Sequence, residues 1–543
     1  MKQLLFLFTV LFLYNCYRSK DLESTGDLNV SIFRDIKLLK ANVGQIIHTG
    51  GFYKEGDVGA AQYEVKEFGK ANDLTVIKLK NRRYAHLIMD IDSFVNVNQA
   101  GAFGLGNIND KRIIQKVLDF HSRVFIPKGI YKLGSEVYLT NNITIKGEDG
   151  TIIMGMLNIR NGKDIKISGF EFKSDLNKWN YGVRIHKQYT EAVEILDCSF
   201  NNQTIIFQDY PINAIPVKKL TIDNCSFYFG NDLENIPITT IQVHASFLKI
   251  MNSNFSLRGI DGAIKNDLGT DKAFIENNYF SGDLDEEIYD FYQYEGDVSF
   301  TNNNINISRG GIIRTKPNTD SEARLIKRNV YYEFSNNVIT HTGDESSSLV
   351  YFSGLFNLKN YISNTQQFVK VIDNTFNLST IYTALNFRGI YNVKCFGNKI
   401  LGRKSNKYSV YLCGIQDLLF NDNTIDAGGI VAVATSSANA KKYKSSVLNG
   451  QWIFTDNVFN NRTRQPEFFH IKEQSGLKIN ISNNYFDYTN LIVNLRNGEY
   501  EKLEINNNKI VMQRPFSNAR NHSLIKYENA KAIKMNKVGN DIK

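Results

Sequence analysis

Proline is scarce in this chain: seven prolines occur among 543 residues. Because proline cannot donate a hydrogen bond to a sheet, its scarcity leaves room for a large amount of regular β-structure. The apolar residues, 42% of the chain, come in short β-branched or aromatic runs that end at Asn, Asp or Gly. This pattern predicts many short strands and few helices.

Cysteine is also scarce, and the five that occur have no spacing typical of a zinc site. Cys198 and Cys225 occupy the same place in two neighbouring copies of a repeat described below. Neighbouring strands of a sheet lie about 4.8 Å apart. We therefore expect these two side chains to touch as a reduced pair in an interior ladder, rather than as a disulfide.

Long apolar runs are absent except at residues 4–13, which are too few to span a membrane as a helix but suit the core of a signal peptide. The following Leu13-Tyr14-Asn15-Cys16 resembles a bacterial lipobox, although Asn15 replaces the usual small residue. The resemblance implies a signal peptide at 1–15, lipidation of Cys16 and a polar tether at 16–27. We expect an exported protein that is lipid-anchored to the outer membrane or cell surface; a periplasmic or secreted protein is the alternative.

A six-residue motif, Ile222-Asp223-Asn224-Cys225-Ser226-Phe227, recurs along most of the chain. Successive copies begin 24 to 37 residues apart. A drifting period of this size predicts a solenoid rather than a globular core. The copies start at Ile167, Ile195, Ile222, Ile250, Ile275, Phe300, Phe334, Val371, Cys395, Phe420, Phe454, Ile481 and Ile505.

Each part of the hexad has a physical role in such a coil. Its first apolar residue is expected to point into the core, and its closing Phe or Ile to point inward from the next strand. The central Asn or Asp makes the corner, because these residues tolerate a left-handed backbone and hydrogen-bond their neighbours. Equivalent residues should then stack from coil to coil, Asn on Asn and Phe on Phe.

The region before the hexads has a different character. Gly-rich turns between short β-like runs predict a small β module at 28–94. Asn109 and Asp110 can cap a helix at 111–121, whose apolar residues fall on one face, and a strand follows at 124–131.

This order of elements resembles the pectate-lyase-like superfamily, found in phage tailspikes and secreted polysaccharide-degrading enzymes. The resemblance implies an all-β fold: a right-handed parallel β-helix at 95–515, capped at its N-terminal end by the helix. Residues 516–543 would form a C-terminal cap or tail.

In that superfamily the substrate lies across the long sheet whose strands precede each hexad. Read with period 2, Val183, Ile241, Ile264, Ile313, Leu385 and Val410 face inward. The outward residues are then Arg184, His186, Gln242, His244, Lys265, Arg314, Lys316, Tyr351, Asn386, Arg388 and Tyr411. A basic and aromatic stripe, on a chain with a formal charge of +9, suits an acidic polysaccharide. The alternative is the ordinary polar exterior of a soluble sheet.

The longest neighbouring gaps between hexads flank the strands of Arg314 and Tyr351, so we expect the cleft at the middle coils. The favoured reaction is β-elimination on a uronic-acid polymer, which needs a group to neutralise the carboxylate and a base for the C5 proton. We predict Lys265, His244 and Arg314 as catalytic residues. Predicted substrate-binding residues are Arg184, His186, Gln242, Lys316, Tyr351, Asn386, Arg388, Tyr411 and Tyr292. The site resembles those of β-helix lyases acting on alginate, pectate and chondroitin or dermatan sulfate, and a glycosaminoglycan such as chondroitin sulfate is the first expectation.

An acidic stretch near these strands could hold Ca²⁺ through Asp283, Asp285 and Glu287, with Asp290 on the following strand. A solvated turn is the plainer interpretation. No organic cofactor is expected.

Two other functions stay open. A glycoside hydrolase of the same fold would need paired carboxylates, for which Asp261, Asp267, Asp285 and Asp290 are available. A surface glycan-binding protein without catalysis is the second. Nucleic acid is not expected as a partner, because no recognition motif is present.

Overall fold

The computed structural model describes most of the chain in 21 segments. These are residues 26–89, 92–173, 180–186, 190–208, 217–230, 239–266, 271–291, 296–315, 329–343, 348–354, 366–379, 383–402, 408–426, 430–433, 450–460, 467–472, 476–487, 491–496, 499–511, 525–528 and 531–542. The signal peptide and Cys16 lie outside the described residues. The chain divides within β10 (Ile143–Ile159) into two units, residues 1–154 and 155–543.

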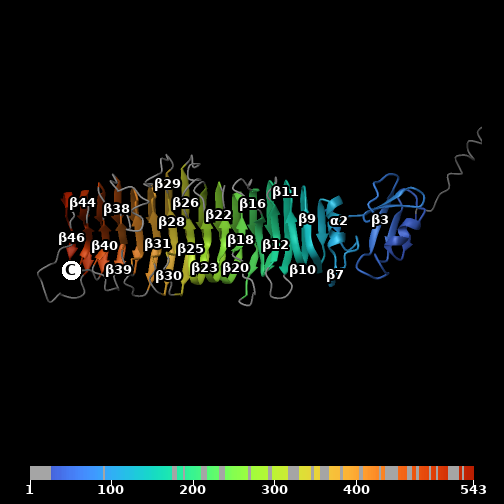
Figure 1. The fold of residues 1–543 in the computed structure, drawn as a ribbon, viewed down its shortest axis with the longest axis horizontal. Helices are drawn as coiled ribbons and strands as arrows, with labels where there is room; N and C mark the ends of the chain where they lie inside the picture. Colours follow the sequence, from blue (N-terminus) through green and yellow to red (C-terminus); the bar gives the residue numbers. More distant parts are fainter. Residues whose placement is uncertain are drawn as a thin grey trace, which may run out of the picture. The chain divides into compact units, whose positions relative to one another are not determined.

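The first unit begins with a five-stranded sheet (Figure 1). Its strand order is β1-β2-β3-β5-β4; β1 and β2 run parallel and the other pairs antiparallel. A short 3₁₀ helix, η1 (Phe33–Leu38), follows β1 and buries Phe33 and Ile36. The strands are β1 (Leu28–Val30), β2 (Ile46–Thr49), β3 (Ala61–Lys66), β4 (Val76–Lys78) and β5 (Tyr84–Leu87).

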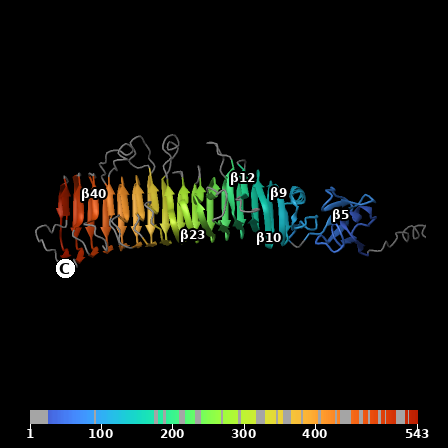
Figure 2. The same cartoon turned by 60° about the horizontal axis from the view of Figure 1, so that its bottom comes forward.

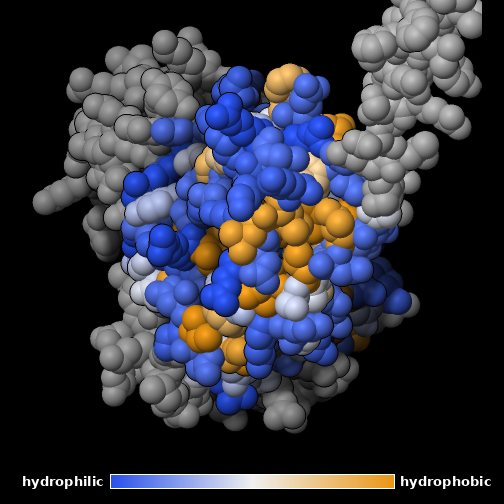
Figure 3. All heavy atoms as spheres, turned by 90° about the vertical axis from the view of Figure 1, so that its right-hand side faces the viewer, coloured by the Kyte–Doolittle hydropathy of each residue, from blue (hydrophilic) through white to orange (hydrophobic). Residues whose placement is uncertain are grey.

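Some apolar side chains of this unit remain on its surface, including Leu38, Val43 and Phe68, which are 72%, 54% and 78% exposed. Figure 3 shows apolar side chains interrupting an otherwise polar face of the molecule. Tyr63 at the centre of the sheet is, by contrast, fully buried.

The predicted helix is present as α2 (Lys111–Phe120), which packs on β8 and β9 through Ile114, Val117 and Leu118. Asp110 occupies the N-cap position, but its carboxylate accepts hydrogen bonds from Phe103 N and Gly104 N instead of from the helix. The neighbouring strands are β6 (Val95–Asn96), β7 (Leu105–Asn109), β8 (Arg123–Ile126) and β9 (Gly129–Leu139).

The second unit is a parallel β-solenoid, and the chain as a whole is an all-β fold of about 12 turns with little helix, which confirms the predicted fold class. Each coil contributes a strand to three parallel sheets, whose stacking is visible in Figure 2. Some long strands bend through corners and serve more than one sheet. They include β11 (Asp164–Lys173), β23 (Tyr279–Phe291) and β25 (Asn304–Thr315), as well as β10, which pairs with β8 through 144–147 and with β12 through 157–159.

The first sheet, which precedes the hexads, also contains β12 (Asn180–His186), β15 (Gln203–Gln208), β18 (Thr239–Val243), β21 (Gly262–Asn266), β28 (Val350–Ser353), β31 (Leu385–Arg388), β34 (Val410–Cys413), β37 (Ile430–Val433), β40 (Glu467–Lys472), β43 (Leu491–Arg496) and β46 (Ile525–Glu528).

The second sheet, in which each hexad begins, contains β13 (Ala192–Leu196), β16 (Val217–Asp223), β19 (Ala245–Met251), β22 (Lys272–Glu276), β24 (Asp297–Thr301), β26 (Val330–Ser335), β29 (Gln367–Ile372), β32 (Asn392–Phe396), β35 (Asp417–Asn421), β38 (Gln451–Thr455), β41 (Lys478–Ser482), β44 (Glu499–Asn506) and β47 (Lys531–Asn536).

The third sheet, in which each hexad ends, contains β14 (Ser199–Asn201), β17 (Ser226–Tyr228), β20 (Asn254–Ile260), β27 (Val338–His341), β30 (Thr375–Leu378), β33 (Lys399–Gly402), β36 (Thr424–Ile425), β39 (Val458–Asn460), β42 (Tyr485–Asp487), β45 (Lys509–Val511) and β48 (Asp541–Ile542).

The hexad starts predicted from the sequence pair with one another in register, from Ile167 with Ile195 through to Ile481 with Ile505. The third residue of most copies is an Asn or Asp with φ between 52° and 57°, which confirms the left-handed corner. These corner residues are Asp197, Asn224, Asn252, Asn277, Asn302, Asn336, Asp373, Asp422, Asp456, Asn483 and Asn507.

The fourth hexad position forms a buried ladder of side chains. Each Asn side chain donates from Nδ2 to the Oδ1 of the next Asn, at 2.8–3.1 Å, and to the carbonyl that opens the preceding hexad. The ladder thereby satisfies backbone groups that the tight corner leaves without a sheet partner. Its members are Asn278, Asn303, Asn337, Asn374, Asn398, Asn423, Asn457, Asn484, Asn508 and Asn540.

Cys198 and Cys225 occupy this same ladder position in the early coils and are buried free thiols, as predicted. Burial, followed by the contact with Cys198, raises the pKa of the Cys225 thiol well above its usual value, so it stays protonated. The closing Phe rings stack next to them: Phe200 and Phe227 lie 4.9 Å apart between ring centroids, close to the strand spacing. Among the described residues no helix has the length and apolar character needed to cross a membrane.

Candidate functional site

One outward row of side chains runs along the first sheet, in strict register. The residues expected to face inward from this sheet, such as Val183, Ile264 and Val410, are fully buried. The outward row is Asn158, Arg184, Ile206, Gln242, Lys265, Asp290, Arg314, Tyr351, Asn386 and Tyr411, and it continues with His470 and Asn494. Asp290 lies on this row between Lys265 and Arg314. Seven of the predicted functional residues share the row with it: Arg184, Gln242, Lys265, Arg314, Tyr351, Asn386 and Tyr411.

Arg314 holds a cluster of three carboxylates on this row. Its Nη1 lies 2.8 Å from Glu287 Oε1, and its Nη2 lies 3.5 Å from Asp290 Oδ2 and 3.7 Å from Glu286 Oε1. One oxygen of each carboxylate lies within 4.8 Å of the others. The side chains of Glu287 and Asp290 are 10% and 5% exposed, whereas that of Glu286 is 42% exposed. A buried acidic pair thus sits beneath an accessible carboxylate.

Glu287 is the most perturbed acid of the cluster. Burial is the main cause that raises its pKa, to about 8; Asp290 and Glu286 add to the rise and Arg314 opposes it. A pKa raised above neutrality favours the protonated form of this carboxyl group at pH 7, although the group lies next to a guanidinium. A carboxylic acid that keeps its proton at neutral pH is able to donate it to a substrate.

A β-bulge explains how consecutive residues of β23 reach the same arginine. Asp283 pairs with Arg309 and Glu287 with Gly311, so the intervening residues of β23 outnumber those of β25. The extra residues turn Glu286 and Glu287 toward Arg314. Gly310, with φ +92°, is the left-handed position of the partner strand, where a Cβ would lie 2.6 Å from Glu286 O.

Gly311 leaves the room that Glu287 occupies, since a Cβ there would lie 2.8 Å from Glu287 Cγ. We expect Gly311→Ala to displace the Glu287 carboxyl group from Arg314 and to lower turnover by roughly tenfold, because misplacing a reacting group weakens catalysis steeply. Steady-state rates on the best substrate would measure the loss. Gly230→Ala is the matched control, as its added Cβ would meet nothing closer than 3.6 Å; equal rates for the two variants would contradict the role of Gly311.

The residues predicted to bind Ca²⁺ separate into two groups. Asp283 Oδ2 and Asp285 Oδ1 lie 3.5 Å and 2.5 Å from Arg309 Nη2, whereas Glu287 belongs to the Arg314 cluster. Carboxylate oxygens of Glu286, Glu287 and Asp290 are of the kind that Ca²⁺ binds. Arg314 lies among these three groups, and its single positive charge offsets one negative charge of the cluster. No step of the reaction is derived through a calcium ion.

The other residues predicted as catalytic or substrate-binding lie apart from this cluster. Lys265 is half-buried on β21 and stabilises the ionised Asp261, whose pKa is nonetheless raised by burial and by Glu286 and Asp285. His244 follows β18, is 7% exposed, and burial lowers its pKa to about 4, so it is neutral at pH 7.

At the N-terminal end of the row, Arg184 lies over the ring of Tyr181, 4.9 Å from its centroid. His186 ends β12, two residues farther along the strand from Arg184. Tyr292 and Lys316 lie outside the described residues.

Toward the C-terminal coils the row becomes aromatic. Arg388 Cζ lies 5.2 Å from the ring centroid of Tyr351 and 5.0 Å from that of Tyr411. Arg388 Nε donates to Asn386 Oδ1 at 3.3 Å, and Asn386 Nδ2 donates to Ser348 Oγ at 2.8 Å. The structure therefore brings together four of the predicted substrate-binding residues.

Sequence reasoning placed Glu286 in the acidic stretch without giving it a role of its own, and it did not place Asp290 on the outward row. The available signal was the Gly310-Gly311 pair, which marks the bulge that brings the two glutamates together.

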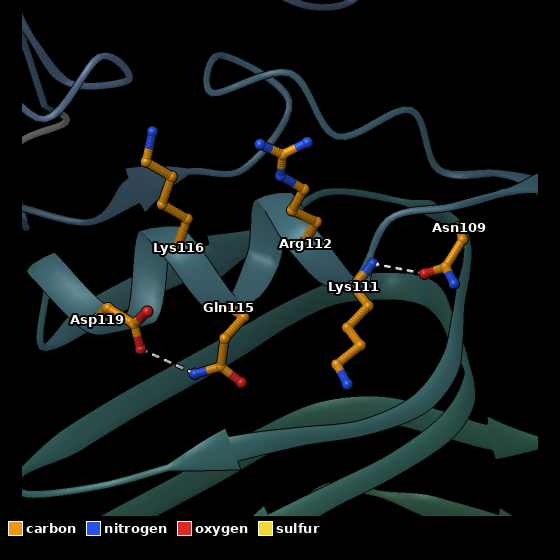
Figure 4. Close-up of a pocket in the computed structure, with 6 residues that line it drawn as sticks. All are labelled: Asn109, Lys111, Arg112, Gln115, Lys116 and Asp119. Atoms are coloured by element: carbon orange, nitrogen blue, oxygen red, sulfur yellow. Dashed lines mark hydrogen bonds between the residues drawn. The ribbon is translucent and has the colours of Figure 1, made fainter.

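A separate hollow lies on α2, lined by Asn109, Lys111, Arg112, Gln115, Lys116 and Asp119 (Figure 4). Figure 4 shows Lys116 and Arg112 extending away from the other lining side chains, while Gln115 Nε2 donates to Asp119 Oδ1 at 2.9 Å. The lining groups come from this helix and the residue preceding its cap. They do not form a set of converging acids and bases like that around Glu287.

No protein-family model matches this chain, and no curated protein matches its sequence. Among solved structures, tailspike protein 4 of bacteriophage CBA120 is 12% identical with a TM-score of 0.37, over 71% of this chain and 50% of that one. Tailspike gp49 of the Acinetobacter baumannii phage Fri1, a capsular polysaccharide depolymerase, is 13% identical with a TM-score of 0.35, over 84% and 75% of the two chains. PfbA, a surface adhesin of Streptococcus pneumoniae, is 15% identical with a TM-score of 0.31, over 83% and 91%.

The chain spans about half the length of the CBA120 tailspike protein. At these identities and TM-scores, the similarity concerns the type of fold, which both depolymerases and an adhesin share, and it transfers neither residues nor activity to this chain.

Proposed function

We propose that this protein cleaves a polysaccharide by acid-catalysed hydrolysis at the Glu286–Glu287–Asp290 cluster. The observation that carries the proposal is Glu287: a carboxyl group with its pKa raised to about 8, with a second, exposed carboxylate within 4.8 Å. Glycoside hydrolysis requires an acid that can donate a proton and a second carboxyl group at a defined distance from it. Their closeness favours the retaining reaction, since inverting enzymes need roughly 6.5–9.5 Å between the two groups to admit a water.

In this mechanism Glu287 donates its proton to the glycosidic oxygen as the bond to the anomeric carbon breaks. The accessible Glu286 carboxylate attacks the anomeric carbon and forms a covalent glycosyl ester. Glu287, now ionised and paired with Arg314, then takes a proton from a water molecule that cleaves the ester. Burial, aided by Asp290, keeps the proton on Glu287 before the reaction, and Arg314 stabilises the charge that Glu287 carries after it.

β-Elimination of a uronic-acid polymer, a glycosaminoglycan in the first instance, is the second candidate. The basic and aromatic residues of the row, above all Lys265 and Arg388, favour it. Of the three residues predicted to catalyse it, Arg314 is paired with three carboxylates, and burial lowers the pKa of His244 to about 4, which makes it a weak base. Lys265 would therefore have to act as the base largely alone, which is why hydrolysis ranks first.

One assay separates these functions. The protein is incubated with a panel of neutral and acidic polysaccharides, with and without a chelator, while reducing ends and the ultraviolet absorbance of unsaturated uronate are followed. Reducing ends without the absorbance are expected. Matching increases in both would show elimination instead, and binding of a panel member without any product would show a glycan-binding protein. Loss of activity in the presence of the chelator would indicate that the protein requires a bound metal ion, such as the Ca²⁺ predicted from the sequence.

A further inference from the structure

The guanidinium group of Arg388 is sandwiched between two tyrosine rings. Its distances to the centroids of Tyr351 and Tyr411 are nearly equal, 5.2 Å and 5.0 Å, and these rings belong to the strands on either side of β31. Strands lie about 4.8 Å apart, so the group lies midway between the rings, at a distance typical of cation–π contacts. Burial is the main cause that raises the pKa of Tyr411, to about 12, which keeps that hydroxyl protonated and the sandwich free of anionic charge.

The sandwich and one hydrogen bond fix the orientation of the guanidinium. Because Nε donates to Asn386, and Asn386 is itself held by Ser348, the edge with Nε faces the protein. The fork of Nη1 and Nη2 is left for another acceptor. A planar fork held in one orientation binds carboxylate, sulfate or phosphate with two parallel hydrogen bonds.

Arg388 differs from the arginines of the neighbouring coils in having no acidic partner. Arg309 pairs with two carboxylates and Arg314 with three. Within the described part of the chain no Asp or Glu lies within ion-pair distance of Arg388, whose side chain contacts the two rings and Asn386. A half-buried cation without a counter-ion is a place where an anion from outside is stabilised.

We propose that Arg388 forms a subsite for one anionic sugar residue, carrying a carboxylate or a sulfate, of the polysaccharide cleaved at Glu287. This inference rests on the proposed function for the position of cleavage. The strand of Arg388 lies two strands beyond that of Arg314, roughly 10 Å along the sheet at about 4.8 Å per strand. A glycan lying along the row would place its charged group at Arg388 and a bond a short distance away at Glu287.

The test measures binding without cleavage, in the full-length Glu287→Gln protein. The probes are polygalacturonate, which carries carboxylates, chondroitin with and without sulfate, and neutral dextran. Arg388→Gln is added on this background, and Arg258→Gln is the matched control, since Arg258 is an exposed arginine on the third sheet, away from the row. Dissociation constants are measured at low and high salt.

We expect at least one acidic probe to bind, and Arg388→Gln to weaken that binding tenfold or more, while Arg258→Gln changes it less than twofold. High salt should reduce the difference between the proteins, because it screens the ion pair. A preference for the sulfated over the unsulfated chondroitin would identify sulfate as the anion, and tight binding of polygalacturonate would identify carboxylate.

The inference is overturned if no acidic probe binds, if Arg388→Gln leaves binding within twofold, or if both arginine variants weaken it equally. Its failure is distinguishable from failure of the proposed function. Cleavage is followed separately in the protein that keeps Glu287. Arg388-dependent binding without cleavage of any probe there would contradict the proposed hydrolysis alone, whereas cleavage of dextran at a rate unchanged by Arg388→Gln would contradict the subsite alone.

Discussion

Replacing Glu287 with glutamine is expected to lower turnover by about 10²–10⁴-fold, the usual contribution of a general acid. The amide keeps the shape of the side chain and can still contact Arg314, but it cannot give up a proton. In the unmodified protein, turnover should fall as the pH rises through about 8, because Glu287 then loses its proton. A pH–rate profile of both proteins measures the loss and the descending limb.

Glu194→Gln is the control for this experiment, because Glu194 is a half-exposed glutamate that pairs with Lys166 on the second sheet. It should keep full turnover and the same pH profile. A Glu287→Gln protein with more than a tenth of the original turnover would show that another group donates the proton.

The same carboxyl group should make stability depend on pH. The pKa of Glu287 in the folded protein, about 8, is raised above the ordinary value of 4.5. Its favourable contribution to the free energy of unfolding is therefore complete below about pH 4.5 and is lost as the pH rises through about 8. The melting temperature should therefore fall between these values, and Glu287→Gln should reduce that fall. An identical fall in both proteins would show that the pKa of Glu287 is not raised.

Asn337→Ala should destabilise the solenoid by roughly 3 kcal/mol or more. The fully buried Asn337 side chain accepts hydrogen bonds from Asn303 N and Nδ2, at 2.9 Å and 3.1 Å, and donates to Phe300 O at 3.0 Å. Alanine leaves these three buried groups without partners, at about 1–3 kcal/mol each. The shift of the urea unfolding midpoint measures the effect.

The neighbouring Asn336→Gly is the control for the ladder. Asn336 is exposed and has a φ of 55°, a conformation that glycine adopts without strain, so this variant should unfold within a few tenths of a kcal/mol of the original protein. Similar midpoints for the two variants would mean that the ladder contributes little to stability.

The solenoid could be predicted from the sequence because each feature that defines a coil is local. A left-handed corner needs Asn, Asp or Gly at one position, and the residues before and after it must be apolar to enter the core. The hexad alone therefore predicts that Asn336 lies at a corner and that Phe334 lies in the core. The inward residues of the first sheet followed from the strict alternation of side chains along a strand.

The candidate site depends instead on which residues of different coils meet. Glu286 and Glu287 reach Arg314 through a bulge whose register relative to β25 cannot be read from β23 alone. In a regular strand, two consecutive residues point to opposite faces of the sheet. Alternation would therefore place Glu286 and Glu287 on different faces, whereas the bulge brings both to the same side. The sandwich of Arg388 likewise needs three strands in register, which only the stacked coils provide.

The in-register row also has a consequence for how a polymer would be selected. Glu287 and Arg388 are held at a separation set by whole numbers of strands, each about 4.8 Å, and the Asn ladder makes that interval stiff. If Glu287 and Arg388 act on one glycan, the distance along the glycan from a charged group to the scissile bond must match the distance between these two residues. Discrimination would then come from the charge periodicity of the polymer rather than from the shape of a closed pocket, and adding or deleting one whole coil between the two residues would change the preferred periodicity by one step.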